Sequence, residues 1–306
     1  MKKALAYIGN VIFSLLLVFS IIGTCVSIAA ANKGMNVEYC LSLMDSEHLV
    51  EKAQNTLKAH FAEQENTTGV PATMFENAIA AEKLDEMMEA TIRNGFDYLN
   101  GNVETLGIKP SFAGLDADMR LFYSSYADMY GYAKDEAYEN AVDEAIAASE
   151  QSILGAVDVF RFSMLDDAGV MKKVRPYSPW VPRAWKGCLI LDGVLLLILL
   201  LLNVKKLRQI WYWAGCSLLS AGVILLVPTV WLKSTEWFDR FTVKSEQTFA
   251  AVTAYLYGLT DTVKLYAIIC LVLAVLAWIV CGICAYRAEK KRKAAKKNRK
   301  PSGENR

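Results

Sequence analysis

The sequence predicts an all-α protein: a bundle of four transmembrane helices with a helical extracytoplasmic domain inserted between spans 1 and 2. Two observations predict this fold. Four long apolar runs each contain near or above the roughly 18 apolar residues needed to cross a bilayer; they cover residues 5–31, 187–204, 210–232 and 265–286. The polar segment between the first two runs carries apolar residues at helical spacing, which predicts packed amphipathic helices.

Charge predicts the orientation of the spans. Residues 33–185 contain 25 acidic and 13 basic residues, whereas residues 287–306 contain 10 basic and 2 acidic residues. Because Lys and Arg close to a span stay in the cytoplasm, we expect both termini and the loop 205–208 on the cytoplasmic side of a cell membrane. Residues 33–185 and the loop 233–263 are then outside. A basic cluster at 172–186 opposes this orientation, but long translocated domains follow the charge rule weakly.

Residues 1–32 are expected to form transmembrane helix 1, acting as an uncleaved signal anchor. The charged start Lys2-Lys3 and the small residues Ala29-Ala30-Ala31 also fit a cleavable signal peptide. The apolar run is longer than the ~7–15 residues typical of a signal peptide, which favours the anchor. Either alternative leaves the acidic domain outside.

Residues 33–175 are expected to form the acidic helical extracytoplasmic domain. Helical regions are predicted at 36–63, 73–99 and 116–171, with an irregular stretch at 101–114 and a break near Gly131 or Gly155. Cys40 is the only cysteine of this segment, so helix packing must hold it together. The expected core positions are Val37, Leu41, Met44, Leu49, Ala53, Leu57, Phe61, Phe75, Ile79, Leu84, Met88, Ile92, Phe96, Leu99, Leu115, Met119, Phe122, Tyr126, Met129, Ala133, Val142, Ile146, Ile153, Val157, Phe160 and Met164.

The remaining segments complete the domain plan. Residues 176–186 repeat proline at every third position among aromatic residues, which predicts an extended, polyproline-like collar. Residues 187–286 hold transmembrane helices 2–4, with the outer loop 233–263, and residues 287–306 form a basic cytoplasmic tail. The outer loop contains aromatic residues at helical spacing, so it either lies on the bilayer surface or packs against the outer domain.

Asp192 and Asn10 are the candidate intramembrane polar residues. Asp192 lies about six residues into the second span, where an unpaired charge costs on the order of 2–3 kcal/mol. It is either an ion, proton or substrate contact, or an acid that hydrogen-bonds a neighbouring helix. Asn10 lies near the opposite membrane face, with Asn203 as a plausible partner, and is too far away to form a conduction path with Asp192. Small residues in the first, third and fourth spans, including Gly23, Ser217 and Ala274, predict close helix contacts.

Other polar patterns indicate no cofactor and no metal or catalytic site. His48 and His60 each precede a glutamate by three residues, but twelve residues separate them, so they cannot share an ion on one straight helix. We interpret both histidines as exposed polar positions. The carboxylates of 82–89 are interpreted as a solvated face, and Asp116-Ala-Asp118 lacks the features of a calcium loop. Cys281-Gly-Ile-Cys284 has redox spacing but lies inside an apolar run, where packing or palmitoylation is expected.

The basic tail is expected to fix topology and to contact anionic lipid. Each basic residue near an acidic membrane contributes about 1 kcal/mol, whereas the tail has no aromatic residues for stacking on nucleic acid. The lipid contacts are assigned to Lys290, Lys291, Arg292, Lys293, Lys296 and Lys297.

Two short motifs carry a resemblance: Tyr39-Cys-Leu-Ser-Leu-Met44 after the first span and Phe96-Asp-Tyr-Leu-Asn-Gly101 in the outer segment. With this order of spans, the chain resembles uncharacterised multi-pass membrane proteins of Gram-positive bacteria with a helical extracytoplasmic domain. That resemblance implies no activity or site.

The expected function is non-enzymatic. We expect an integral membrane protein with an extracytoplasmic interaction or sensing module, which binds an envelope protein or self-associates. The alternative is a transporter, a channel or an accessory subunit of a transport complex that uses the transmembrane bundle. The size of the outer segment favours the first hypothesis, and Asp192 is the residue that favours the second.

Overall fold

The computed structural model describes residues 2–204 and 207–297. All regular elements in these ranges are helical, and no strand occurs among them. The chain divides into two compact units. We call residues 1–31, 181–235 and 259–306 the apolar unit, and residues 32–180 and 236–258 the helical domain.

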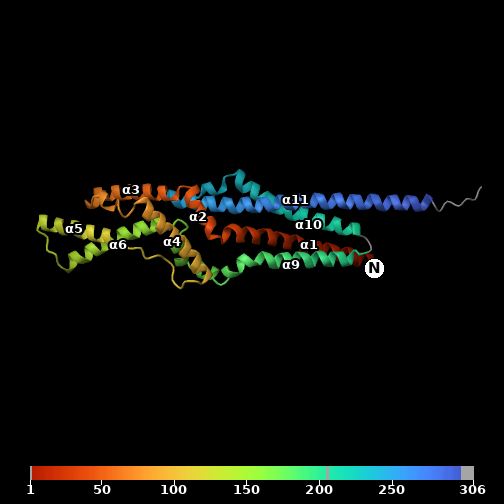
Figure 1. The fold of residues 1–306 in the computed structure, drawn as a ribbon, viewed down its shortest axis with the longest axis horizontal. Helices are drawn as coiled ribbons and strands as arrows, with labels where there is room; N and C mark the ends of the chain where they lie inside the picture. Colours follow the sequence, from red (N-terminus) through yellow and green to blue (C-terminus); the bar gives the residue numbers. More distant parts are fainter. Residues whose placement is uncertain (1, 205–206, 298–306) are drawn as a thin grey trace, which may run out of the picture. The chain divides into compact units, whose positions relative to one another are not determined.

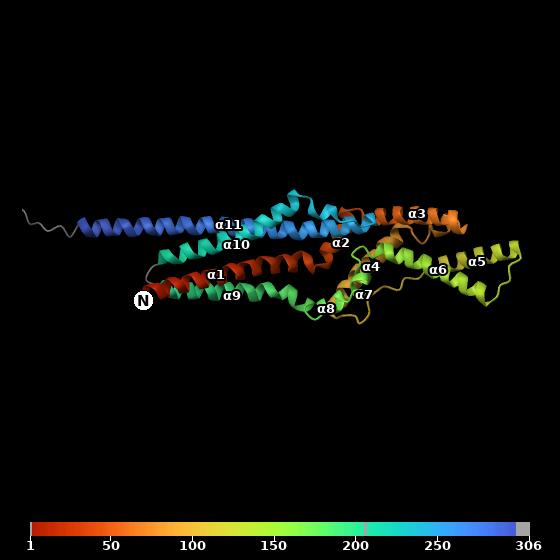
Figure 2. The same cartoon turned by 180° about the vertical axis from the view of Figure 1, so that it is seen from behind.

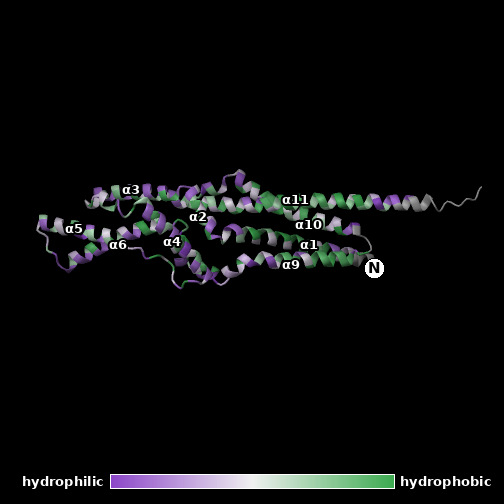
Figure 3. Cartoon of the chain, in the orientation of Figure 1, coloured by the Kyte–Doolittle hydropathy of each residue, from purple (hydrophilic) through white to green (hydrophobic). Residues whose placement is uncertain are grey.

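The apolar unit contains four helices that are long and apolar enough to cross a membrane. They are α1 (Lys2–Ala29), α9 (Val181–Leu202), α10 (Leu207–Ser234) and the part of α11 (Glu246–Lys297) that begins at Leu259. Each of the four predicted apolar runs coincides with one of these helices, and Figure 3 shows their hydrophobic colouring. The 52 residues of α11 correspond to about 78 Å of helix, far more than a bilayer requires.

Successive helices of the apolar unit run in opposite directions (Figures 1 and 2). At one end, Asn10 of α1 contacts Asn203 after α9, and the Cys281 thiol of α11 donates to the Arg208 carbonyl of α10, 3.5 Å away. At the other end, Thr24 of α1 contacts Asp192 of α9, and Lys233 of α10 pairs with Asp261 of α11 at 2.7 Å. The first and third helices are therefore antiparallel to the second and fourth.

Small residues allow these helices to approach closely, as the sequence predicts. A Cβ atom on Gly222 of α10 would lie 2.8 Å from Cδ2 of Leu271 and 3.1 Å from the Ala267 carbonyl oxygen of α11. Ala221 and Ala274 are fully buried, and Gly23 of α1 faces the Cys188 sulfur of α9. The expected small-residue contacts of the first, third and fourth spans are thus confirmed.

The helical domain is built mainly from five longer helices with short turns between them. Its core joins α2, α3, α4, α5 and α6 with the start of α11. The elements are η1 (Ala30–Gly34), α2 (Val37–Ser46), α3 (Leu49–Thr68), η2 (Ala72–Phe75), α4 (Ala81–Asn100), α5 (Ala113–Tyr130), α6 (Glu136–Val157), α7 (Phe162–Asp167), α8 (Val170–Val174), η3 (Ser178–Trp180), η4 (Trp237–Arg240) and the α11 residues up to Gly258.

The predicted apolar periodicity identifies most of this core. All the expected positions of α3 and α4 are buried, and Phe61 stacks on Phe75 with ring centroids 3.8 Å apart. Val142, Ile146 and Ile153 of α6 are buried as expected. In and after α5 the prediction holds only in part: Leu115 and Met119 are buried and Phe122 is half-buried against the core, whereas Tyr126, Met129 and Ala133 are exposed. Met164 is also exposed rather than buried.

Side-chain caps and glycines set the helix ends. Asn36 Oδ1 accepts a hydrogen bond from the Tyr39 N–H at the start of α2, and Asp135 caps α6 through the Tyr138 N–H. Such caps satisfy N–H groups that have no partner within the helix. Gly101 ends α4 and Gly131 ends α5 in the left-handed conformation, which glycine adopts without steric cost. The predicted break at Gly131 and the irregular stretch after Gly101 are therefore confirmed.

The predicted helix boundaries need two corrections. The expected helix 36–63 is two helices, because the chain turns at His48, whose φ of 51° is left-handed. The turn lets Met44 and Leu49, on either side of it, both reach the core. The second helix starts at Ala81 rather than near residue 73, because Ala72–Phe75 forms a separate 3-10 turn that carries Phe75 into the core.

The prediction of an extended collar at 176–186 is wrong. Ser178–Trp180 forms a 3-10 turn, and α9 already begins at Val181 with Pro182 in its first turn. Proline is tolerated there because the first N–H groups of a helix need no intrahelical acceptor.

The expected outer loop 233–263 is divided between the two units. Residues 236–258 belong to the helical domain, where Ala251 is fully buried in the core and Gln247 accepts a hydrogen bond from Thr56. Of the two predicted alternatives for this loop, packing against the domain formed by residues 32–180 is the one observed.

Cys40 is buried in the helical domain with only 1% of its surface exposed. Burial raises the pKa of its thiol from 9.0 to about 12. Because the thiolate is the nucleophile that attacks thiol reagents, Cys40 is expected to be inert at neutral pH in the folded protein.

Candidate functional site

Asp192 is held by a residue of the first helix. The Thr24 hydroxyl of α1 donates to Asp192 Oδ2 of α9 at 2.7 Å, while Oδ1 is shielded from solvent and has no hydrogen-bond partner. The hydrogen bond offsets part of the cost of placing this carboxylate among apolar helices. Of the two sequence hypotheses, contact with a neighbouring helix is therefore present, and the second oxygen is left available.

Two thiols lie next to this contact. Cys25, which follows Thr24, has its sulfur 3.8 Å from the sulfur of Cys270 on α11, and both side chains are buried. On the α9 side, Ser27 approaches the Cys188 sulfur at 3.9 Å, and Ser20 donates to the Cys188 carbonyl at 3.5 Å. These weak polar contacts join α1 to α9 and α11 around Asp192.

Asn10 pairs with Asn203, as the sequence predicts. Each amide donates to the other, with N–O distances of 3.2 and 2.6 Å, and both residues are buried. One turn further along α1, the hydroxyls of Ser14 and Ser217 lie 2.7 Å apart. Reciprocal bonds of this kind satisfy buried polar groups and fix the register of the packed helices.

Asn10 and Asp192 do not come together. The Thr24 that holds Asp192 is fourteen residues beyond Asn10 on the same helix, which corresponds to about 21 Å. Leu17 and Val18, which are buried, lie between the two levels. The two candidate residues therefore belong to separate helix contacts.

The helical domain presents a tyrosine cluster that the sequence analysis missed. Tyr126, Tyr130 and Tyr132, at the end of α5 and in the turn after it, are 45–61% exposed. Their ring centroids are 4.6 Å apart for Tyr126 and Tyr130, and 6.3–6.4 Å for the pairs that include Tyr132. Met129 beside them is 76% exposed. The available signal was the density of tyrosine among acidic residues, but the apolar periodicity predicts Tyr126 and Met129 as core residues.

The cavities of the helical domain include four that are lined by described residues. The largest of these four, of about 500 Å³, is bordered by η2, α4 and the start of α5. Its charged lining residues, Lys83, Glu86 and Asp118, are of mixed sign, and no histidine or cysteine lines it. None of these four cavities includes Asp192.

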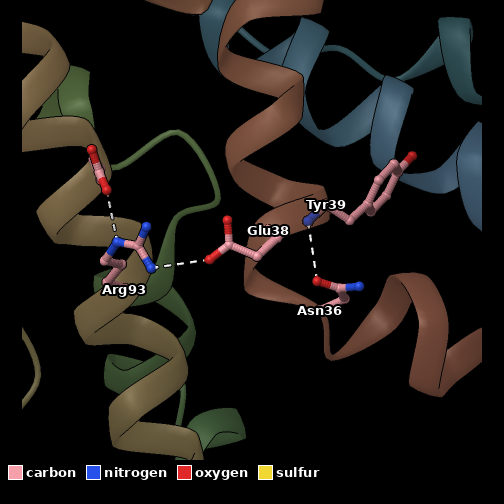
Figure 4. A network of polar contacts seen from close by, with 5 residues as sticks. Asn36, Glu38, Tyr39 and Arg93 are labelled. Atoms are coloured by element: carbon pink, nitrogen blue, oxygen red, sulfur yellow. Dashed lines mark hydrogen bonds and ion pairs between the residues drawn. The ribbon is translucent and has the colours of Figure 1, made fainter.

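The acidic residues of α4 form an exposed face. Partial burial and the neighbouring carboxylates Asp45 and Glu89 raise the pKa of Asp85. Arg93 offsets part of this charge by pairing with Glu89 on its own helix. It also pairs with Glu38 of α2, as Figure 4 shows. Among residues 2–204 and 207–297, no group of three or more His, Cys, Asp or Glu side chains is arranged to hold a metal.

The histidines occupy different environments. His48 is exposed at the turn between α2 and α3, whereas His60 is half-buried beside Phe61 with its Nε2 unpartnered. The expectation of an exposed position therefore fails for His60.

The lipid-contact residues are described only in part. Lys290 and Lys293 are exposed on α11, and Lys293 pairs with Glu289. The side chains of Lys291, Arg292, Lys296 and Lys297 lie outside the described residues, as do the structures of Lys205 and Lys206 in the predicted cytoplasmic loop.

Comparisons of this chain with protein-family models, with curated proteins and with solved structures found no match.

Proposed function

We propose that this chain is a multi-pass membrane protein whose four apolar helices anchor a non-enzymatic interaction module outside the cytoplasm. The observation that carries the proposal is the division of the chain. The helical domain has an apolar core of its own, separate from the core of the apolar unit. In the apolar unit, by contrast, the buried polar residues mainly join helix to helix.

The helix directions support the orientation of this proposal. Because α1, α9, α10 and α11 alternate in direction, Asn10, Asn203, Arg208 and Cys281 share one end of the apolar unit. Lys2, Lys3, Arg208 and Lys290, which belong to the predicted cytoplasmic basic segments, lie on helices toward this end. The other end holds Thr24, Asp192 and the Lys233–Asp261 ion pair, and there the chain passes into the residues of the helical domain.

Photo-crosslinking in living cells tests the interaction module. A photoreactive amino acid would replace exposed residues on different faces of the helical domain: Glu63 on α3, Glu82 on α4 and Leu121 on α5. We expect a discrete crosslinked band from at least one position, identified by mass spectrometry as a defined partner or a second copy. An exposed position on α11, Ala288, serves as the control and is expected to give a different pattern. If none of the three positions in the helical domain gives a crosslinked band, the proposal is contradicted.

Transport remains the second candidate because Asp192 keeps one buried oxygen without a partner. The anchor proposal predicts that Asp192→Asn leaves growth and ion or solute flux unchanged, since an asparagine oxygen still accepts the Thr24 hydroxyl. Thr24→Val, which removes that donor, serves as the comparison and is expected to affect only stability. Loss of flux in Asp192→Asn, in a protein that reaches the membrane at normal levels, would favour the transporter.

A further inference from the structure

We propose that the tip of the α5–α6 hairpin is a docking surface for an arginine-rich basic peptide segment of a partner protein. This inference rests on the proposed function, because it names the face of the helical domain that binds and the chemistry of what it binds. The surface, called here the tyrosine tip, consists of Tyr126, Met129, Tyr130 and Tyr132.

The first observation is an apolar stripe that continues past the core it belongs to. Leu115 and Met119 of α5 are 5% and 1% exposed, as core residues should be. Seven to ten residues further along the same stripe, Tyr126 and Met129 are 45% and 76% exposed. The only fully buried residue near the tip is the small Ala127. Clusters of large apolar side chains on a protein surface mark interaction sites, because exposing apolar surface to water is unfavourable and does not stabilise the fold.

The second observation is the arrangement of the rings. Tyr126 lies within 6.4 Å of both Tyr130 and Tyr132, centroid to centroid, and its plane is only 13° from that of Tyr132. Three rings therefore gather around one point at the end of the hairpin. Tyrosine presents a large face at low entropic cost, and its π-electrons attract a planar guanidinium.

The third observation is charge. Residues 113–157, which form the hairpin, contain nine acidic and two basic residues. Both basic residues are already engaged: Arg120 pairs with Asp116, Glu139 and Asp143, and Lys134 pairs with Asp128. The excess carboxylates give the hairpin a negative field, which attracts a basic partner and repels a second copy of the same surface.

Together, the rings and carboxylates select arginine over lysine. A guanidinium stacks flat on a tyrosine ring and hydrogen-bonds a carboxylate in its own plane, whereas an ammonium is a compact, strongly hydrated charge. The occupant is therefore a peptide segment with several arginines. The net negative charge of the hairpin disfavours an anionic lipid surface or an acidic polymer as the occupant.

Binding of defined peptides to the full chain tests this inference. The chain would be held in nanodiscs of zwitterionic lipid, and fluorescent (Gly-Arg)6, (Gly-Lys)6 and (Gly-Glu)6 peptides would be titrated by anisotropy. We expect (Gly-Arg)6 to bind more tightly than (Gly-Lys)6 and (Gly-Glu)6 not to bind. Binding should weaken as salt is raised, because exposed charges are screened.

Variants separate the tyrosine tip from general acidity. Replacing Tyr126, Tyr130 and Tyr132 together with alanine is expected to weaken (Gly-Arg)6 binding about tenfold or more, since three ring–cation contacts are lost. Replacing the same three with phenylalanine keeps the rings and should retain most of the affinity. The matched control is Tyr177→Ala, which removes a 71% exposed tyrosine elsewhere and should change nothing.

The inference is overturned if wild-type chain does not bind (Gly-Arg)6, or if the triple alanine variant binds it as well as wild type does. It is also overturned if that variant changes the oligomeric state in sedimentation, because the tip would then be a contact between copies. Glu63 and Glu82 lie on α3 and α4, outside the α5–α6 hairpin. If a partner is crosslinked there but (Gly-Arg)6 does not bind the tyrosine tip, the proposed function stands and this inference is wrong.

Discussion

Replacing Phe61 with alanine is expected to lower the free energy of unfolding of the helical domain by about 3–5 kcal/mol, the range for truncating a buried aromatic side chain. Phe61 is 1% exposed and stacks on Phe75 at 3.8 Å, so its loss leaves a cavity where α3 meets η2. Chemical denaturation of the purified full chain, followed by circular dichroism, measures the change. The control is Leu121→Ala on α5, where 69% of the side chain is exposed and little should change. Equal stability of the two variants would contradict the packing described for this core.

Replacing Gly222 with valine is expected to separate α10 from α11, at a cost of about 3 kcal/mol, the upper part of the range for overpacked cores. The new Cβ would meet Leu271 Cγ at 2.9 Å and the Ala267 carbonyl oxygen at 3.1 Å, and a backbone atom cannot rotate out of the way. A lower midpoint of thermal unfolding in detergent is the expected measurement.

Gly282→Val gives the matched control for that experiment. Gly282 also lies within an apolar helix, but no atom outside its local backbone lies within 4 Å of the position its Cβ would take. The same change of residue should therefore leave the midpoint nearly unaltered. If the two valine variants unfold at the same temperature, the close approach of α10 and α11 at Gly222 does not exist.

The sequence was sufficient for the helices and for most of the core because both depend on local periodicity. The predicted apolar runs coincide with the four apolar helices, and every predicted core position of α3 and α4 is buried. The Asn10–Asn203 pair was also predictable, since two buried amides at the same depth require partners.

The remaining features depend on tertiary contacts that periodicity does not contain. Tyr126 and Met129 continue the helical spacing of Leu115 and Met119, so the sequence pattern predicts all four as buried. Tyr126 and Met129 are exposed because the core ends before it reaches them. The turn at His48 arises because residues on both sides of it are buried in the same core. Likewise, the contact between Thr56 and Gln247, 191 residues apart, is what brings part of the expected loop into the helical domain.

Sidedness in the membrane is the central claim, and single-cysteine labelling tests it most directly. All seven native cysteines would be replaced by alanine, and one cysteine introduced at the exposed Ala117 of α5 or at the exposed Ala288 of α11. Cys40 itself is unsuitable because it is buried. With a membrane-impermeant maleimide, the account predicts that Ala117→Cys is labelled in intact cells and that Ala288→Cys is labelled only after the cells are opened. Labelling of Ala288→Cys in intact cells, with Ala117→Cys protected until lysis, would contradict the orientation and the proposed function that depends on it.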